Sequence, residues 1–467
     1  MFEVTMFSVL RQKPGFYSRL WRLALPIILQ NLITTSLGFV DTFMVGLLGN
    51  EELSAVTAAN TPIFLVQVII FGLMSGLTVL VCQYWGKGDA ASINRVMGVA
   101  MYVGIAISGV AALLLFLFPE GVMALVTNNA QLIELGAPYV RIVGVSYVFN
   151  AVSSVYVSMQ RSTENPGFGM LVFATSMLLN TFLNYCLIFG NFGAPRLGIT
   201  GAAAATLASR VVEFIIVLVY AICNKRVPLI PKALFCPGRA MLKSAAVYAG
   251  PVILNETLWG LGTTVMTAIM GHMVISADML AAYAIMGNID KFSTVACFGV
   301  AGATAVIVGK RIGERADKEE VYNLSCCLLL VSFLLGAVIA LALLIVLPTV
   351  FIPYLYPLFS LTEKATEVAV TMCVVYIVMM PLKSYDISNI TGVLRAGGDA
   401  RMAAILDLCP LWLVSVPLTA LTGLVLDAPI WLVCFGIYSE NTCKMPLGII
   451  RLRSRKWIND VTIREGE

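Results

Sequence analysis

Apolar runs long enough to cross a lipid bilayer recur at fairly regular spacing along the 467 residues of this chain. A hydrocarbon core about 30 Å thick requires about 20 mostly apolar residues per helix. The runs are about twice as long as a barrel strand and lack its alternation of polar and apolar residues. The sequence therefore predicts an all-α integral membrane protein with twelve transmembrane helices. We place these helices at 20–46, 55–83, 93–118, 136–159, 168–190, 199–222, 243–271, 279–308, 322–347, 368–390, 401–423 and 429–450.

An internal repeat divides the chain into two related halves. The segment Ala24–Gly46 matches Ala249–Gly271 at an offset of 225 residues, so that Pro26 aligns with Pro251. A repeat of this length changes the expected fold, because each half then forms a unit of its own. We expect two pseudo-symmetric bundles of six helices, and we assign a conformational role to the two prolines, since a proline inside a helix removes one backbone hydrogen bond.

The segment 223–243 is basic and contains three prolines, which is typical of a cytoplasmic linker. We therefore divide the chain into an amino-terminal lobe at 1–222, this linker, and a carboxy-terminal lobe at 244–467 that ends in a basic tail. Each lobe contains six predicted spans. Because an even number of spans returns the chain to the same side, the lobes insert in the same orientation and are related by an axis along the membrane normal.

Basic residues indicate the orientation in the membrane. If the amino terminus lies inside, the inner segments contain the stretches from Arg11 to Arg22 and from Arg451 to Arg464, whereas the outer segments contain only Arg196 and Lys364. This asymmetry predicts that both termini are cytoplasmic. The net charge of +4 lies mainly on the inner rim and requires no nucleic-acid partner. We expect no cleavable signal before the first span.

Catalytic and metal-binding patterns are not found in the sequence. The eleven cysteines include no C-x-x-C pair, His272 is the single histidine, and no nucleotide-binding G-x-x-x-x-G-K-[ST] motif occurs. An enzyme would require a nucleophile with its base or a cluster of metal ligands. We therefore expect a protein that is not an enzyme and has no cofactor.

Asp41 is the strongest candidate for function. It lies about four-fifths of the way along the first span, and a carboxylate within a membrane helix costs on the order of 2.5–3.5 kcal/mol. The repeat aligns Asp41 with Met266, so only the first half has an acid at this position. The alternative is that Asp41 caps a helix or forms an ion pair near the outer interface.

Polar residues in the fifth and sixth spans can join Asp41. Asn180 and Asn184 are four residues apart and lie on one helix face, and Thr206 follows a run of alanines. Together with Asp41 they form a set of oxygen atoms suited to a monovalent cation or to a protonated carboxyl group. Asp41 would bind Na⁺ if the protein is coupled to sodium. The alternative is that the asparagines only hold helices together.

Acids in the second half are candidates for a substrate or secondary proton site. Glu256, which the repeat aligns with Asn31, could bind a cationic substrate or relay a proton, or could pair with a basic residue of a neighbouring span. Asp386 is the second candidate, although Lys383, three residues earlier, is placed to neutralise it. We interpret three further groups of charged residues in the spans as internal ties: Asp407, Arg210 with Glu213, and Glu440 with Lys444.

Five stretches together resemble the multidrug and toxic compound extrusion (MATE) family of prokaryotic transporters. They are ALPIILQNLITTSLGFVDTFMVGLLG, QYWGKGD, NTFLNYCLIFG with GITGAAAAT, LRAGGDAR and RLRSRKWI. The resemblance covers nearly the entire chain. It implies a V-shaped, two-lobe antiporter of the bacterial inner membrane that exports organic cations and amphipathic compounds in exchange for H⁺ or Na⁺. It also implies a monomer that needs only membrane lipid and its small-molecule substrates as partners.

The resemblance assigns a cation site to Asp41, Asn180, Asn184 and Thr206. Some relatives have an aspartate where this chain has Asn184, so the site here has one formal negative charge, which favours H⁺ over Na⁺. Two other functions are compatible with the sequence. A flippase for lipid-linked oligosaccharides would require a cavity rich in Arg and Lys, and a receptor or scaffold would show no transport.

Overall fold

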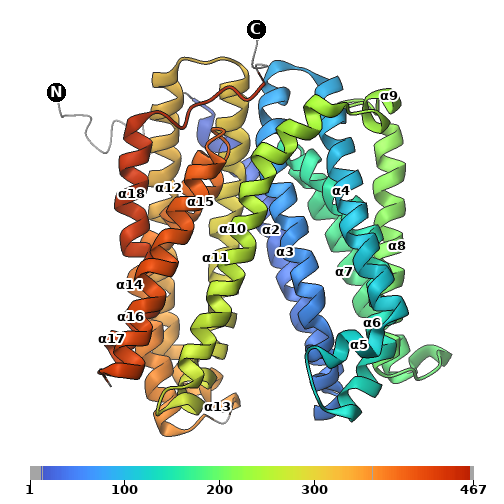
Figure 1. Cartoon of the computed structure of the whole chain (residues 1–467), viewed down its shortest axis with the longest axis vertical. Coiled ribbons are helices and arrows are strands. Elements are labelled where there is room, and N and C mark those ends of the chain that lie inside the picture. Colours follow the sequence, from blue (N-terminus) through green and yellow to red (C-terminus); the bar gives the residue numbers. More distant parts are fainter. Residues whose placement is uncertain (1–11, 13, 360, 427, 463–467) are drawn as a thin grey trace. The chain divides into compact units, whose positions relative to one another are not determined.

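The computed structural model describes residues 12, 14–359, 361–426 and 428–462, and within these ranges all regular structure is helical (Figure 1). Arg11, Lys13 and Arg464 of the predicted inner segments lie outside them. The chain folds as two compact units. The amino-terminal unit is Leu25–Ile253, and the carboxy-terminal unit combines Met1–Ala24 with Leu254–Glu467. The predicted lobe boundaries at 222 and 244 stay a prediction. The two compact units are divided differently, because each unit includes the start of a helix that the prediction assigned to the other lobe.

The described residues of the first half form six long helices and short connecting turns. Their bounds are α2 (Phe16–Gly46), α3 (Asn50–Lys87), α4 (Ala90–Leu117), α5 (Pro119–Ala124), α6 (Ala130–Ser162), α7 (Pro166–Phe189), η1 (Asn191–Gly193), α8 (Ile199–Cys223) and α9 (Pro231–Phe235).

The helices of the second half are interrupted more often. Their bounds are α10 (Arg239–Gly271), α11 (Ser276–Gly313), α12 (Lys318–Val346), η2 (Leu347–Leu355), α13 (Tyr356–Leu358), α14 (Glu363–Ile387), η3 (Ser388–Leu394), α15 (Ala400–Pro410), η4 (Leu411–Ser415), α16 (Val416–Ala420), η5 (Leu421–Val425), α17 (Ile430–Tyr438) and α18 (Glu440–Ser454). The segments η2 to η5 are π-helical, and such widened turns often mark functional or strained positions.

Helices occupy all twelve predicted spans, and ten of them are long and apolar enough to cross a membrane among the described residues. The two exceptions have physical explanations. In α10, Asn255 and Glu256 lower the mean hydropathy of the middle of the helix. The predicted span at 429–450 is divided between α17 and α18 at Ser439, and neither piece alone has the length of a span.

Two long helices belong to both units. The start of α2 lies in the carboxy-terminal unit up to Ala24, and the start of α10 lies in the amino-terminal unit up to Ile253. Pro26 and Pro251 lie inside these helices, each within three residues of the point where the helix passes from one unit to the other. A proline weakens the helix at that point because it cannot donate its backbone hydrogen bond.

The segment between the halves packs against the amino-terminal unit. Asn94 on α4 donates a hydrogen bond to the Pro228 carbonyl oxygen (3.1 Å) and accepts one from the Ile230 backbone N–H (3.1 Å). A Cβ atom at Gly98 would overlap the Leu234 carbonyl oxygen. The predicted linker is therefore fixed along α4 from Pro228 to α9.

Close contact between α7 and α8 depends on small residues. A Cβ atom at Gly201 would lie 2.5 Å from the Leu187 carbonyl oxygen, so a larger residue cannot replace this glycine without moving the two helices apart. The alanines that follow, Ala202, Ala203 and Ala205, are also buried. Small residues of this kind allow membrane helices to approach closely. The run GAAAAT thus brings the polar residues of α7 next to those of α8.

Two of the stretches that carry the family resemblance contact each other at the end of the chain. After α18, Trp457 is fully buried, and its side chain occupies the space that a Cβ atom at Gly397 would need. The Asn459 backbone N–H donates a hydrogen bond to the Gly397 carbonyl oxygen (2.9 Å), and Arg451 pairs with Asp399 (2.6 Å). LRAGGDAR and RLRSRKWI therefore form one structural element.

Replacing Trp457 with Ala is expected to destabilise the protein by about 3–5 kcal/mol, because it removes a large buried ring and leaves a cavity. Thermal unfolding of the detergent-purified protein measures the loss. Trp431→Ala is the matched control, since 58% of the Trp431 residue is exposed. Equal effects of the two substitutions would contradict the assignment of a structural role to the tail.

Candidate functional site

The four residues predicted to form a cation site lie together in the amino-terminal unit. Asn184 on α7 donates a hydrogen bond from Nδ2 to Oδ1 of Asp41 on α2 (2.6 Å), and Nδ2 also contacts Oδ1 of Asn180 (3.0 Å). Asn180 in turn donates from Nδ2 to the Thr206 hydroxyl on α8 (3.4 Å). One chain of hydrogen bonds therefore connects three helices, with the carboxylate at one end.

Ser209 extends this chain, and the sequence analysis missed it. Asn180 Nδ2 donates to the Ser209 hydroxyl (3.3 Å), which is anchored by donating to the Ala205 carbonyl oxygen (2.7 Å). Ser209 lies three residues after Thr206 and so on the same face of α8. This spacing is the signal that could have identified it.

The asparagine side chains have remaining capacity to bind a ligand. Both are buried, and Oδ1 of Asn184 has no hydrogen-bond partner among the described residues. A buried oxygen acceptor without a partner is costly unless a donor or cation satisfies it. Because the side chains linked to Asp41 offer amide and hydroxyl groups, the oxygen set fits a proton on Asp41 or a hard monovalent cation.

A fixed positive charge lies near this site. Arg210 pairs with the fully buried Glu213 (2.7 Å), as the sequence analysis predicted for these two residues, and it also interacts electrostatically with Asp41. Among the described residues there is no group of three or more His, Cys, Asp or Glu side chains that could hold a metal ion. The predicted site therefore contains one carboxylate, and the guanidinium near it is paired with a second carboxylate that is not among the predicted site residues.

In the carboxy-terminal unit, Glu256 forms an ion pair. Its Oε1 lies 2.8 Å from Nη2 of Arg395, whose side chain is buried just after the π-helical segment η3. Glu256 therefore pairs with a basic residue, as the alternative interpretation expected, although Arg395 follows a predicted span and does not lie within one. A role of Glu256 in substrate or proton binding stays a prediction.

A second ionic cluster surrounds Lys444 on α18. Its buried ammonium pairs with Asp407 on α15 (2.7 Å) and with Glu440 one turn earlier (3.0 Å), and Asn255 on α10 donates to the other oxygen of Asp407 (2.9 Å). The predicted internal ties of Asp407 and of Glu440 with Lys444 are thus present. The cluster connects three helices of this unit.

Asp386 is not neutralised by Lys383, so this prediction was wrong. Lys383 instead forms an ion pair with Asp290 on the neighbouring helix α11. Asp386 is 4% exposed, and within the described part of the chain neither of its carboxylate oxygens has a hydrogen-bond partner. Spacing along one helix shows which side chains could meet, but it does not show which residues of an adjacent helix compete for them.

Asp290 was missed by the sequence analysis. It lies inside the predicted span at 279–308, so the rule that identified Asp41, an acid within a membrane helix, would have found it. The Tyr376 hydroxyl donates to the same oxygen of Asp290 (2.8 Å) that Lys383 contacts. The carboxy-terminal unit therefore contains at least three ionic contacts between helices.

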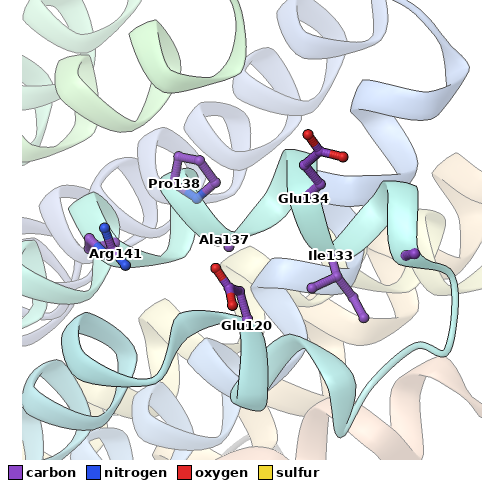
Figure 2. Close-up of a pocket in the computed structure, with 7 residues that line it drawn as sticks. Glu120, Ile133, Glu134, Ala137, Pro138 and Arg141 are labelled. Atoms are coloured by element: carbon purple, nitrogen blue, oxygen red, sulfur yellow. The ribbon is translucent and has the colours of Figure 1, made fainter.

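A surface pocket of about 400 Å³ lies between α5 and the beginning of α6 (Figure 2). Glu120, Glu134 and Arg141 line it together with Ala137 and Pro138, and the Arg141 guanidinium lies over the Phe116 ring at 5.9 Å. The lining contains none of the predicted site residues. The pocket is therefore separate from the hydrogen-bonded chain at Asp41.

Comparisons with known proteins agree with this architecture. The MatE family model matches the chain twice, at residues 26–186 and 251–421, and the two matches begin at the prolines that the repeat aligns. A probable multidrug resistance protein NorM of Thermotoga maritima is 23% identical over 450 residues, which cover 95% of this chain and 94% of that protein. The uncharacterized transporter YisQ of Bacillus subtilis is 25% identical over 451 residues, or 94% of each chain.

Solved structures share the fold. A transporter of the MOP superfamily from Pyrococcus furiosus has a TM-score of 0.83 at 19% identity and covers 97% of this chain and 98% of its own. A mutant of the Vibrio cholerae MATE transporter VcmN also has a TM-score of 0.83, at 18% identity, and covers 97% of this chain and 99% of its own.

The fold defines a multi-pass membrane protein of helical bundles. The chain belongs to the MatE family, and it is a membrane transporter and not an enzyme.

Proposed function

We propose that the protein is a secondary antiporter that exports organic cations or amphipathic compounds in exchange for H⁺ or Na⁺, and that Asp41 binds the coupling ion. The observation that carries this proposal is the 2.6 Å hydrogen bond between Asp41 and Asn184 inside a chain of buried amides and hydroxyls. A carboxylate within a membrane helix is a functional candidate by default because its burial is costly.

Neutralisation of Asp41 is the proposed coupling step. A proton or Na⁺ from outside neutralises the carboxylate and rearranges its hydrogen bonds to Asn184, and α2 repacks near Pro26 as the substrate is released. Each charge that moves through the membrane potential gains about 2.3 kcal/mol per 100 mV. Ion and substrate are coupled only if they favour different conformations or compete for one site.

The oxygen set around Asp41 favours H⁺ as the coupling ion. Only one formal negative charge is present among the four predicted site residues, because position 184 is an asparagine. Na⁺ would require the amide and hydroxyl oxygens to replace most of its hydration shell without a second carboxylate. A proton requires only Asp41 itself and a hydrogen-bond acceptor, which Asn184 Oδ1 supplies.

We further propose that the protein works as a monomer in the bacterial inner membrane, with both termini in the cytoplasm. The relatives from Thermotoga maritima and Bacillus subtilis are bacterial, and basic residues are concentrated in the predicted inner segments. Both halves of the repeat are present in one chain, so a second copy of the protein is not needed to supply the second helical bundle.

The flippase alternative is less well supported. It requires unpaired basic side chains that could hold a pyrophosphate group. Arg395, Lys383 and Lys444 each pair with a carboxylate in the carboxy-terminal unit. In these ion pairs the basic side chains are already neutralised by carboxylates, so they are not free to bind a pyrophosphate group.

Transport in proteoliposomes tests the proposed function. We expect ethidium to move against its gradient when a pH gradient is imposed, and to move less or not at all with a Na⁺ gradient alone. Liposomes without protein are the control. Movement that is the same with and without either gradient would contradict the antiporter, and movement driven only by Na⁺ would overturn the preference for H⁺.

A further inference from the structure

The ion pair of Asp290 and Lys383 lies deep within the membrane region and remains partly open. Asp290 lies 14 residues into α11, which corresponds to about 21 Å of helix. Its side chain is 33% exposed and that of Lys383 is 22% exposed. Charges at this depth avoid lipid and face water-filled space, because contact with hydrocarbon is costly. The pair is therefore accessible to a solute from an aqueous side.

One aromatic ring faces the ammonium group of this pair, and a second ring packs against the first. Lys383 Nζ lies over the Tyr376 ring at 5.3 Å, and the Tyr438 ring on α17 packs edge-on against Tyr376 with centroids 5.5 Å apart. The Tyr376 hydroxyl also donates to Asp290 (2.8 Å), which fixes the carboxylate relative to the ring. A carboxylate beside a tyrosine face is an arrangement that can recognise organic ammonium groups.

We propose that Asp290, Tyr376 and Tyr438 form a binding site for the cationic group of a substrate, and that the Lys383 ammonium occupies this site when no substrate is bound. The site lies in the carboxy-terminal unit and contains none of the residues assigned to coupling at Asp41. The inference rests on the proposed function, since it assumes that organic cations are transported.

The lysine acts as a tethered competitor. An incoming cation must displace Lys383 from Asp290, so the apparent affinity is the intrinsic affinity multiplied by the fraction of protein in which the site is free. When no substrate is bound, Lys383 neutralises the Asp290 carboxylate, which avoids an uncompensated charge within the membrane. Removing the lysine charge should therefore tighten the binding of an organic cation.

Binding of tetraphenylphosphonium to the purified full-length protein tests this proposal. If Lys383 occupies the site about 90% of the time, Lys383→Met tightens Kd by about tenfold. Lys383→Gln, which keeps a hydrogen-bond donor near Asp290, is a second variant in case the methionine variant does not fold, and it should tighten Kd in the same direction. Adding Asp290→Asn to either variant should abolish the gain. Equilibrium dialysis gives Kd, and thermal unfolding confirms that each variant is folded.

Lys291→Met is the matched control, because Lys291 is exposed, neighbours Asp290 in the sequence and carries the same charge. It should change Kd by less than about twofold. If the wild type binds and exports the probe but neither Lys383 variant binds it more tightly, the site is overturned while the antiporter stands. If neither the wild type nor the Lys383 variants bind the probe, both the site and organic-cation export are overturned.

Discussion

The Asp41→Asn variant is expected to insert, fold and let ethidium equilibrate down its gradient, but to lose export driven by a pH gradient completely. Asparagine has the shape of aspartate, and its Oδ1 can still accept the hydrogen bond from Asn184 that measures 2.6 Å in the wild type. The variant therefore imitates the neutralised state permanently. Without a group that gains and loses charge, the ion gradient has no means of biasing the two conformations.

Asp317→Asn is the matched control for this experiment. Asp317 is exposed and caps the first turn of α12 by accepting a hydrogen bond from the Glu319 backbone N–H (3.1 Å). Asparagine is an equally good capping residue, so export should remain at the wild-type level. The measurement is ethidium movement in proteoliposomes under an imposed gradient. Uphill export by Asp41→Asn at more than the background of empty liposomes would refute the coupling role of Asp41.

Replacing Lys444 with Met is expected to destabilise the protein by about 3–5 kcal/mol, because it removes a buried cation and leaves two largely covered carboxylates, 16% and 17% exposed, without their partner. Lys444 pairs with both Asp407 and Glu440, and it also acts electrostatically on Asp386. The loss should therefore exceed that of any exposed ion pair in the chain, which typically contributes about 0–1 kcal/mol. Thermal unfolding of the detergent-purified variant measures it.

Removing both charges of the Lys444–Asp407 ion pair distinguishes the electrostatic cause of the lost stability from a loss of packing. The double variant Lys444→Met with Asp407→Asn should recover a large part of the lost stability, since one of the uncompensated charges is gone. Lys364→Met, a substitution of an exposed lysine, should have little effect. A double variant that is less stable than Lys444→Met alone would show that the buried charges are not the cause.

Much of the fold could be predicted because membrane helices leave a strong pattern in one sequence. Lipid requires long apolar runs, and these gave the positions of the helices, including the six that were expected on each side of the linker. The spacing of Asn180 and Asn184 placed both on one face of α7, where the two side chains contact each other. These features are local, so a single sequence contains them.

The carboxy-terminal ionic contacts could not be predicted in the same way. Whether Lys383 meets Asp386 on its own helix or Asp290 on α11 depends on how two helices are rotated against each other. The π-helical segment between Asp386 and Arg395 rotates the residues after it relative to those before it, and no residue pattern predicts this rotation. The break of the last span at Ser439 likewise depends on tertiary packing.

The exchange of helix starts between the units has a consequence for how the protein can be divided. A fragment that ends at residue 222 would lack the start of α10, which packs so closely on α3 that a Cβ atom at Gly76 would lie 2.5 Å from the Ala249 Cα. Neither half contains all the segments that complete its own bundle. Two halves expressed as separate chains would therefore have to exchange these segments to complete both units, whereas in the single chain the exchange is intramolecular.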